Sequence, residues 1–383
     1  MEAVLRSKQI DLALQAALTA GARLLPRFSA ELIDWHNRPG SEISAGYHVK
    51  YLDEKSAPVT DFLYVTTAEV GPPAVGVESG DLHLEVWRHP NDPRLPSLAL
   101  ATNPQTVAAW LAAVPRDFGK LVDLTLVGYR PLRRAVLRAQ GESSAVFIKL
   151  LRPDKMPDLI RRHELVADAG LSAHHLGTPA QGVLLLPQAP GNSLLNLFLA
   201  KAEVPAPAEL IHVLDRLPTA ALELKHKPAW SERLDFHAAT AAPRIGADKA
   251  EELKNRIEEV LAAAPVGPLV VTHGDFYERN IMIDGDQISL IDLDSLGPGL
   301  REDDLACALG HLAVLPGISA DHYGHLEPVV DQWTEHFSKQ VDESALAVRV
   351  AAVILSLIAG AADSEVDARL ALVETWISKA EST

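Results

Sequence analysis

Three polar side chains in the second half of the chain, those of Asp275, Asn280 and Asp292, have the types and spacing that phosphoryl transfer needs. His273-Gly274-Asp275 stands five residues ahead of Asn280, and Asp292 follows at the end of the next apolar segments. A carboxylate can accept a proton from a hydroxyl, while an amide oxygen and a second carboxylate can hold Mg²⁺. The apolar run at 269–271 predicts a buried strand that leads into this polar loop.

A hairpin is predicted directly after the loop. Two apolar runs, residues 281–283 and 288–291, flank Asp284-Gly285-Asp286, which is a two-strand turn signal. Asn280 precedes the first run and Asp292 follows the second. Because pairing the strands brings their outer ends together, we expect Asn280 and Asp292 to lie at one rim. Mg²⁺ suits such a rim, since it binds few protein groups besides substrate phosphates.

This stretch resembles the catalytic and metal-binding loops of the aminoglycoside phosphotransferase and choline kinase family, whose members are relatives of the protein kinases. In that family the loop is His-Gly-Asp, four residues, then Asn, and the following strand ends in Ile-Asp. Protein kinases carry Arg where this chain has Gly274, and Asp-Phe-Gly where it has Asp292-Leu293-Asp294. Both differences favour the branch that acts on small molecules.

The resemblance implies a role for each polar residue of the loop. Asp275 would be the catalytic base, Asn280 and Asp292 would hold magnesium, and His273 would brace the loop backbone. Asp304 precedes Leu-Ala, where family members carry an aspartate that opens a helix and braces the catalytic loop.

A lysine in an earlier strand extends the resemblance. Residues 145–151 predict a strand in which Lys149 lies between two apolar neighbours on its own face. A buried ammonium is costly unless an anion meets it. Glu164 follows fifteen residues later in a predicted helix, residues 159–167. The resemblance implies that Lys149 holds the nucleotide phosphates and that Glu164 orients it. The alternative is an edge strand whose lysine discourages aggregation.

A hinge that binds adenine is expected between these two segments. Residues 182–186 predict an apolar strand that breaks at Pro187, and Asn192 or Ser193 would cap the next helix. An ordinary strand-turn-helix is compatible with the same pattern. The predicted adenine contacts are Leu186, Gln188 and Ala189.

The chain ahead of residue 119 contains a partial echo of the segment that leads to Lys149. Residues 124–138 predict a strand, a turn and a strand, and residues 33–51 mirror them; residues 62–65 then mimic the Lys149 strand without its lysine. We hypothesise that residues 1–118 hold a degenerate copy of the kinase small lobe, retained as a cap. The N-terminal region is also similar to that of maltokinases and bacterial glucosamine kinases, which favours a sugar as substrate.

The predicted fold is α+β: a protein-kinase-like two-lobed fold with an extra N-terminal cap. Residues 1–118 would form the cap, residues 119–188 the N-lobe ending in the hinge, and residues 189–383 a mainly helical C-lobe. Predicted helices in the C-lobe include residues 208–214 and 249–263, where apolar residues recur at helical spacing.

Composition limits the kind of protein this is. With 383 residues and 48% hydrophobic content the chain can form two or three domains. A single cysteine, Cys307, excludes a disulfide framework, and the start of the chain lacks a signal-peptide pattern. The longest apolar run, residues 350–362, is too short to span a bilayer. A formal charge of −16 argues against nucleic acids and anionic membranes as partners. We therefore expect a cytoplasmic protein; its oligomeric state is not predicted.

Four charged residues near the loop have two interpretations each. Arg279 points to solvent or stabilises phosphate charge during transfer. Glu302 and Asp303 are charges at a helix start or meet a substrate amine. Asp294 bridges metal or hydrogen-bonds nearby backbone.

The predicted function is ATP- and Mg²⁺-dependent transfer of a phosphoryl group to a hydroxyl of a small molecule, with a sugar or amino sugar favoured. One alternative is an antibiotic-inactivating aminoglycoside phosphotransferase, which needs a wide acidic pocket. A second is a kinase-like module that binds nucleotide without turnover. The pattern of residues does not choose between ATP and GTP.

Overall fold

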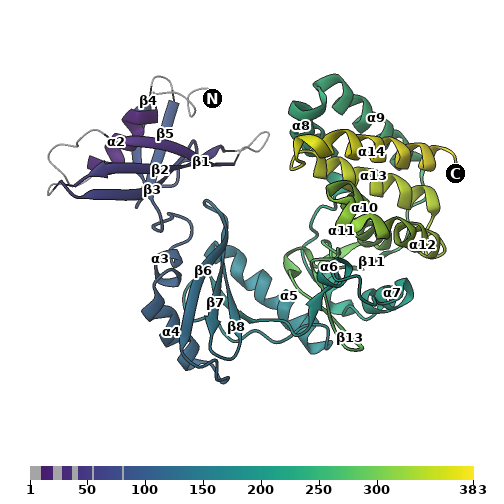
Figure 1. Cartoon of the computed structure of the whole chain (residues 1–383), viewed down its shortest axis with the longest axis horizontal. Helices are drawn as coiled ribbons and strands as arrows, with labels where there is room; N and C mark the ends of the chain where they lie inside the picture. Colours follow the sequence, from purple (N-terminus) through teal and green to yellow (C-terminus); the bar gives the residue numbers. More distant parts are fainter. Residues whose placement is uncertain (1–9, 20–27, 37–41, 54–55, 80–81) are drawn as a thin grey trace. The chain divides into compact units, whose positions relative to one another are not determined.

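The computed structural model describes residues 10–19, 28–36, 42–53, 56–79 and 82–383 (Figure 1). Two segments used in the sequence analysis lie outside these ranges. They are the first six residues, which were read for a signal-peptide pattern, and residues 37–41, which belong to the segment that mirrors residues 124–138. The chain forms two compact units: residues 1–157 with 175–188, and residues 158–174 with 189–383. The predicted division at 118 and 188 stays a prediction.

The first part of unit 1 is a five-stranded antiparallel sheet in the order β1-β2-β3-β5-β4. Alternate residues of its central strands, such as Tyr47, Val49 and Leu63, form a core with Leu14 of the helix α2 (Figure 1). This alternation is the period-two pattern of a sheet with one covered face. The elements are α2 (Ile10–Thr19), β1 (Ser29–His36), β2 (Ser44–Leu52), β3 (Pro58–Thr66), β4 (Val75–Ser79) and β5 (Leu82–Arg88).

The second part of unit 1 is a four-stranded antiparallel sheet in the order β6-β7-β8-β9. Val146, Ile148 and Leu150 of β8 are fully buried and share a core with Val107 and Leu111 of α4. The predicted strand at 145–151 is confirmed. The elements are α3 (Leu98–Ala101), α4 (Pro104–Ala113), β6 (Leu121–Arg130), β7 (Arg134–Gly141), β8 (Ala145–Leu151) and β9 (Val183–Pro187).

The two sheets of unit 1 share three consecutive antiparallel strands, and in both of them helices precede these strands in the chain. The helix α2 precedes β1 in the first sheet, and α3 and α4 precede β6 in the second. The idea that the cap is a copy of the small lobe stays a hypothesis.

Asp92 joins the first sheet to the β6–β7 turn. This carboxylate is 2% exposed and accepts the hydroxyl of Tyr129 at 2.7 Å and the N–H of Leu132 at 2.7 Å. Leu132 has a left-handed backbone, φ 63°, and packs with Tyr64 and Trp87 of the first sheet. A turn that is strained in this way needs support from its surroundings, and Asp92 with the two aromatic rings supplies it.

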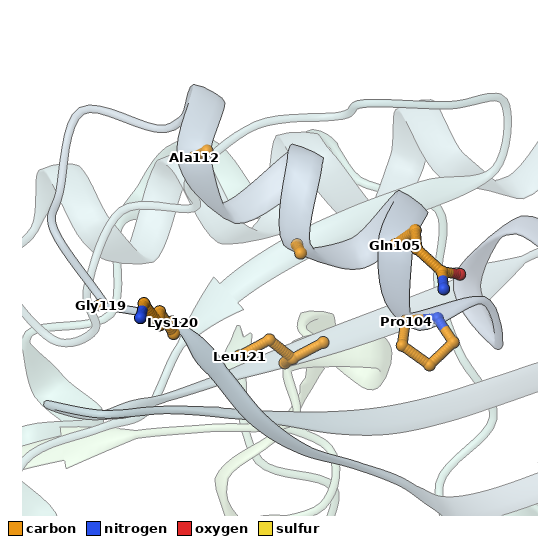
Figure 2. Close-up of a pocket in the computed structure, with 7 residues that line it drawn as sticks. Pro104, Gln105, Ala112, Gly119, Lys120 and Leu121 are labelled. Carbon is orange, nitrogen blue, oxygen red and sulfur yellow. The ribbon is translucent and has the colours of Figure 1, made fainter.

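An open groove lies between α4 and the start of β6 (Figure 2). Its lining is mostly small or apolar and contains none of the predicted site residues. The residues that line it are Pro104, Gln105, Ala108, Ala112, Gly119, Lys120 and Leu121.

Unit 2 is mainly helical and holds the largest hydrophobic core of the described residues. The predicted helices at 208–214 and 249–263 are confirmed as parts of α7 and α9. The helices are α5 (Met156–Asp168), α6 (Leu194–Leu199), α7 (Pro207–Asp215), α8 (Leu234–Ile245), α9 (Ala247–Ala263), α10 (Arg301–Ile318), α11 (Ala320–Tyr323), α12 (Glu327–Phe337), α13 (Glu343–Ile358) and α14 (Val366–Glu381).

Two small sheets of unit 2 frame the polar loop. β10 (Asn192–Ser193), β12 (Ile281–Asp284) and β13 (Gln287–Leu290) form one, and β11 (Leu269–Thr272) and β14 (Gly297–Leu300) form the other. In the β12–β13 pair, Ile281 lies opposite Leu290 and Asp284 lies opposite Gln287, so the predicted hairpin is confirmed. The residue that caps α6 is Ser193, whose hydroxyl accepts the N–H of Asn196.

No helix in the described part of the chain combines the length and apolarity that a membrane crossing requires.

Candidate active site

The loop after β11 is fastened by Asp304, at the start of α10. Its Oδ2 accepts the N–H of His273 and its Oδ1 the N–H of Gly274, both at 2.8 Å. The carboxyl is buried, and burial raises its pKa to about 7 against the opposing effect of these two hydrogen bonds. The two hydrogen bonds from His273 and Gly274 are the contacts that the bracing role predicted for Asp304 requires.

His273 ties the loop to the end of the hairpin. Its Nε2 bonds to the carbonyl of Ile291 at 3.0 Å, and its Nδ1 accepts the N–H of Asp275 at 3.3 Å. These partners assign the proton to Nε2. Burial lowers the pKa of His273, in keeping with a neutral ring. The imidazole thus bridges the residue before Asp292 and the backbone of Asp275.

Gly274 occupies a position that no other residue fits. Its φ is +76°, and a Cβ there would lie 2.7 Å from the Cβ and the carbonyl oxygen of Ser295. Glycine adopts this conformation without strain. The close approach holds the loop against the segment that follows Asp292.

Asn280 closes the other end of the loop. Its Nδ2 donates to the carbonyl of Asp275 at 3.0 Å, and its own carbonyl accepts the N–H of Ile291 at 3.0 Å. The hairpin therefore places Asn280 next to the Ile291–Asp292 segment, as the pattern predicts. Asp292 has a left-handed backbone, φ 57° and ψ 60°, which aspartate tolerates better than most residues.

The donor set at this rim fits a hard cation that also binds phosphate. Because the Nδ2 of Asn280 is bonded to Asp275, its Oδ1 is the atom left to act as a ligand. Within the described ranges, no group of three or more His, Cys, Asp or Glu side chains could hold a metal ion. A cation here would need Asn280, Asp292 and oxygens from a substrate, which is the way Mg²⁺ is usually held.

The other two acids of α10, Glu302 and Asp303, are both withdrawn from solvent. The Oδ1 of Asp303 accepts the hydroxyl of Ser231 at 2.8 Å and lies 3.2 Å from the Nε of Arg349. Glu302 is buried. Arg279, by contrast, is exposed.

An aromatic cluster beside the loop was missed at the level of sequence. The ring of Tyr277 stacks on the imidazole of His311, with centroids 4.1 Å apart, and Trp230 meets the same imidazole edge-on at 6.4 Å. The sequence did contain a signal for the position of His311. Asp304, Cys307 and His311 recur at helical spacing, so they lie on one face of α10, and Asp304 is bonded to the loop. Glu278, also missed, is buried in the loop, and burial raises its pKa to about 7.

Lys149 lies in unit 1, in the middle of its sheet. β8 pairs with β7 on one side and β9 on the other, placing Lys149 opposite Val136 and Leu184. The edge-strand alternative is therefore wrong. The side chain is 6% exposed, so the ammonium is largely withdrawn from water. Glu164, which is partly exposed, belongs to α5 in unit 2.

The predicted hinge follows β9. Leu186 pairs with Phe147, and the N–H of Gln188 donates to the carbonyl of Ala145 at 3.0 Å. That amide is therefore already used within unit 1. Contact of these residues with a nucleotide stays a prediction.

Comparison with known proteins decides the family. The model of the phosphotransferase enzyme family matches residues 133–325, which is half of the chain and spans the Lys149 strand, the polar loop and Asp304. The chain belongs to this family. Phosphotransferase membership and the kinase-like α+β fold, both predicted from the motifs, are thereby confirmed. The comparison with curated proteins gives no match.

Solved structures support the fold of this phosphotransferase. A choline/ethanolamine kinase family protein from Mesorhizobium loti is 18% identical, with a TM-score of 0.50; the match covers 73% of this chain and 97% of that one. An amicoumacin kinase in complex with AMP-PNP, Ca²⁺ and Ami is 14% identical, also with a TM-score of 0.50; the match covers 74% of this chain and 96% of that one. At these identities the likeness concerns the fold alone.

Proposed function

We propose that this phosphotransferase moves the γ-phosphate of ATP to a hydroxyl of a small molecule, with a sugar or amino sugar as the acceptor. One observation carries the proposal: Asp304, His273, Asp275 and Asn280 form a continuous set of hydrogen bonds that ends beside Asp292. The backbone around the candidate base and both candidate metal ligands is therefore fixed by the protein itself. Fixed groups are effective because phosphoryl transfer depends mainly on positioning and charge stabilisation.

Each candidate residue has a defined task in this proposal. Asp275 accepts or positions the proton of the acceptor hydroxyl. Asn280 and Asp292 hold Mg²⁺, which when bound neutralises charge on the phosphates. Lys149 orients the nucleotide phosphates and Glu164 orients Lys149. The adenine contacts the predicted hinge at Leu186, Gln188 and Ala189.

The related fold supports a nucleotide and a divalent cation as cofactors. The amicoumacin kinase was solved with AMP-PNP and Ca²⁺, a nucleotide analogue and a divalent ion. We extend that pair of ligand classes to this chain as ATP and Mg²⁺, because the Asn280–Asp292 rim has oxygen donors of the right type.

The charges at the start of α10 support a sugar over a polycationic antibiotic. Asp303 is engaged by Arg349 and Ser231, and Asp304 by two amides of the loop. Glu302 is buried. These three acids are therefore not available to bind substrate amines, and an aminoglycoside needs several such carboxylates. Tyr277 lies in the loop, and the face of its ring that is not stacked on His311 suits the apolar face of a sugar ring.

ADP release over a panel of acceptors tests the proposed function. The panel holds sugars, amino sugars, choline-like alcohols and aminoglycosides, each with ATP and Mg²⁺. We expect turnover with a sugar or amino sugar that is lost when EDTA removes the metal. Turnover with aminoglycosides alone would replace the sugar assignment, and nucleotide binding without turnover on any acceptor would favour a non-catalytic module.

A further inference from the structure

The helix α5, which carries Glu164, packs as part of unit 2. Its buried residues Leu165 and Val166 belong to the hydrophobic core of that unit, together with Leu293 and Leu296 from the segment after Asp292. The sheet core of unit 1 includes no residue of α5 among those described. The helix therefore shares its hydrophobic core with the segment that follows Asp292.

A buried arginine fastens α5 to that segment. Arg162 is 2% exposed, and its Nε donates to the carbonyl of Leu296 at 3.0 Å. Its Nη1 donates to the carbonyl of Asp158 at 2.9 Å and its Nη2 to that of Lys225 at 3.4 Å. Three donors of one planar group thus bind three separate stretches of backbone, which only arginine can do.

A second hydrogen bond joins the far end of α5 to the other side of the same loop. The N–H of Leu290, two residues before Asp292, donates to the carbonyl of Leu171 at 2.7 Å. Leu171 lies just beyond the end of α5, and Arg162 lies at its middle. The two contacts bracket residues 291–295 from both sides.

The positive charge of Arg162 interacts with the negative charge of Asp294, a residue of the loop. Burial lowers the pKa of the guanidinium, while Asp158 and Asp294 act in the opposite direction. The group nevertheless stays protonated at neutral pH. A permanent cation is therefore held near Asp294.

We propose that Arg162 is a positioning residue that makes α5 a fixed brace of the 290–296 loop, so that Glu164 and Asp292 move as one body. This inference rests on the proposed function only for the statement that Asp292 binds a metal ion.

Hydrogen exchange of the ligand-free protein tests the brace. Arg162→Gln removes the fork, and Arg161→Gln, one residue away on the exposed face of the same helix, is the matched control. We expect the amides of Leu290, Ile291 and Leu296 to exchange about tenfold faster in Arg162→Gln and to be unchanged in Arg161→Gln. Amides of α13 should keep their wild-type rates in both. If Arg162→Gln does not fold, Arg162→Lys, which keeps the charge but lacks the fork, takes its place.

The Mg²⁺ dependence of turnover is the second readout. Loss of a direct partner of a metal ligand typically weakens metal affinity about 10- to 100-fold. Because Arg162 acts on Asp292 only through the loop backbone, we expect the Mg²⁺ concentration for half-maximal rate to rise by about 10-fold, the low end of that range, in Arg162→Gln. The KM for the acceptor should not change. Equal exchange in both variants, or a uniform rise that includes α13, overturns the brace. A wild-type protein that fails to bind Mg²⁺-ATP overturns the proposed function instead, and the exchange data still decide the role of Arg162.

Discussion

At the scale of single residues, the candidate site is built from polar residues that each make two hydrogen bonds. Asp304 satisfies two consecutive amides, His273 accepts at one nitrogen and donates at the other, and Asn280 bonds on both sides of the loop. Together these hydrogen bonds restrict the conformation of the loop backbone. The site is therefore sensitive to changes that keep its charge but remove one of these contacts.

Asp304→Ala should destabilise the protein and slow turnover, because two buried amides lose their acceptor. A buried donor left unsatisfied costs about 1–3 kcal/mol, so we expect a loss of about 2–5 kcal/mol in the free energy of unfolding, measured by chemical denaturation. Asp304→Asn, which keeps one acceptor oxygen, should lose less. Asp286→Ala, in the exposed hairpin turn, is the control. Equal stability of the Asp304→Ala and Asp286→Ala variants would show that the brace is dispensable.

His311 should make the protein sensitive to acid. Burial, helped by Arg279 and Arg369, lowers its pKa to about 3, whereas the unfolded chain has a value of about 6.5. The unfolded state therefore takes up the proton first, and stability is lost as the pH falls through this window. Between pH 7 and pH 5 the loss is about 2 kcal/mol. His311→Phe, which keeps a ring against Tyr277, should lose about that much less over the same range; an unchanged pH profile would argue against a neutral buried imidazole.

At the scale of elements, sequence patterns predicted what local chemistry dictates. The Asp-Gly turn and its flanking apolar runs predicted the hairpin, and the alternation around Lys149 predicted β8. Features that depend on distant partners were left open or were not predicted. The choice between an edge and an interior position for β8 depends on β9, which is far along the chain, and the burial of Arg162 rather than Arg161 depends on Leu296. Only the position of Arg162 in the apolar stripe between Leu159 and Val166 gave a hint.

Lys149→Met should weaken ATP binding and leave the sheet intact. The core face of β8 is formed by its other residues, and a methionine fits between the apolar neighbours of Lys149. A hydrogen bond to a charged group is worth about 1.5–3 kcal/mol, so we expect the KM for ATP to rise about 10- to 100-fold at an unchanged melting temperature. Lys120→Met, exposed beside β6, should leave the KM for ATP as it is. An unaltered KM in Lys149→Met would remove this lysine from the nucleotide site.

At the scale of the whole molecule, the motifs identified the family and left the N-terminal part undetermined. The family match begins at residue 133, so it says nothing of the first sheet. Sequence alone predicted a cap but not its strand order, because sheet order depends on long-range pairing. Nor did it predict the Asp92 joint to the β6–β7 turn, which brings together residues some forty positions apart.

Asp92→Ala should loosen the joint between the first sheet and the β6–β7 turn. Four donors lose one buried acceptor: the hydroxyl of Tyr129 and the amides of Arg94, Leu95 and Leu132. We expect unfolding to become easier by about 2–5 kcal/mol and limited proteolysis near residue 92 to speed up. Asp123→Ala, on the exposed side of β6, should change neither. Wild-type resistance to protease in Asp92→Ala would mean that the aromatic contacts hold the joint unaided.

The role of Asp275 is tested most directly by single-turnover transfer from ATP in the Asp275→Asn variant, with nucleotide affinity measured in parallel by calorimetry. The substitution keeps the backbone N–H that bonds to His273, so the loop should fold and ATP should bind with wild-type affinity. We expect the rate of phosphoryl transfer to fall by about 10²- to 10⁴-fold, as for the loss of a general base. Transfer at the wild-type rate would contradict the assignment of this carboxylate and with it the proposed mechanism.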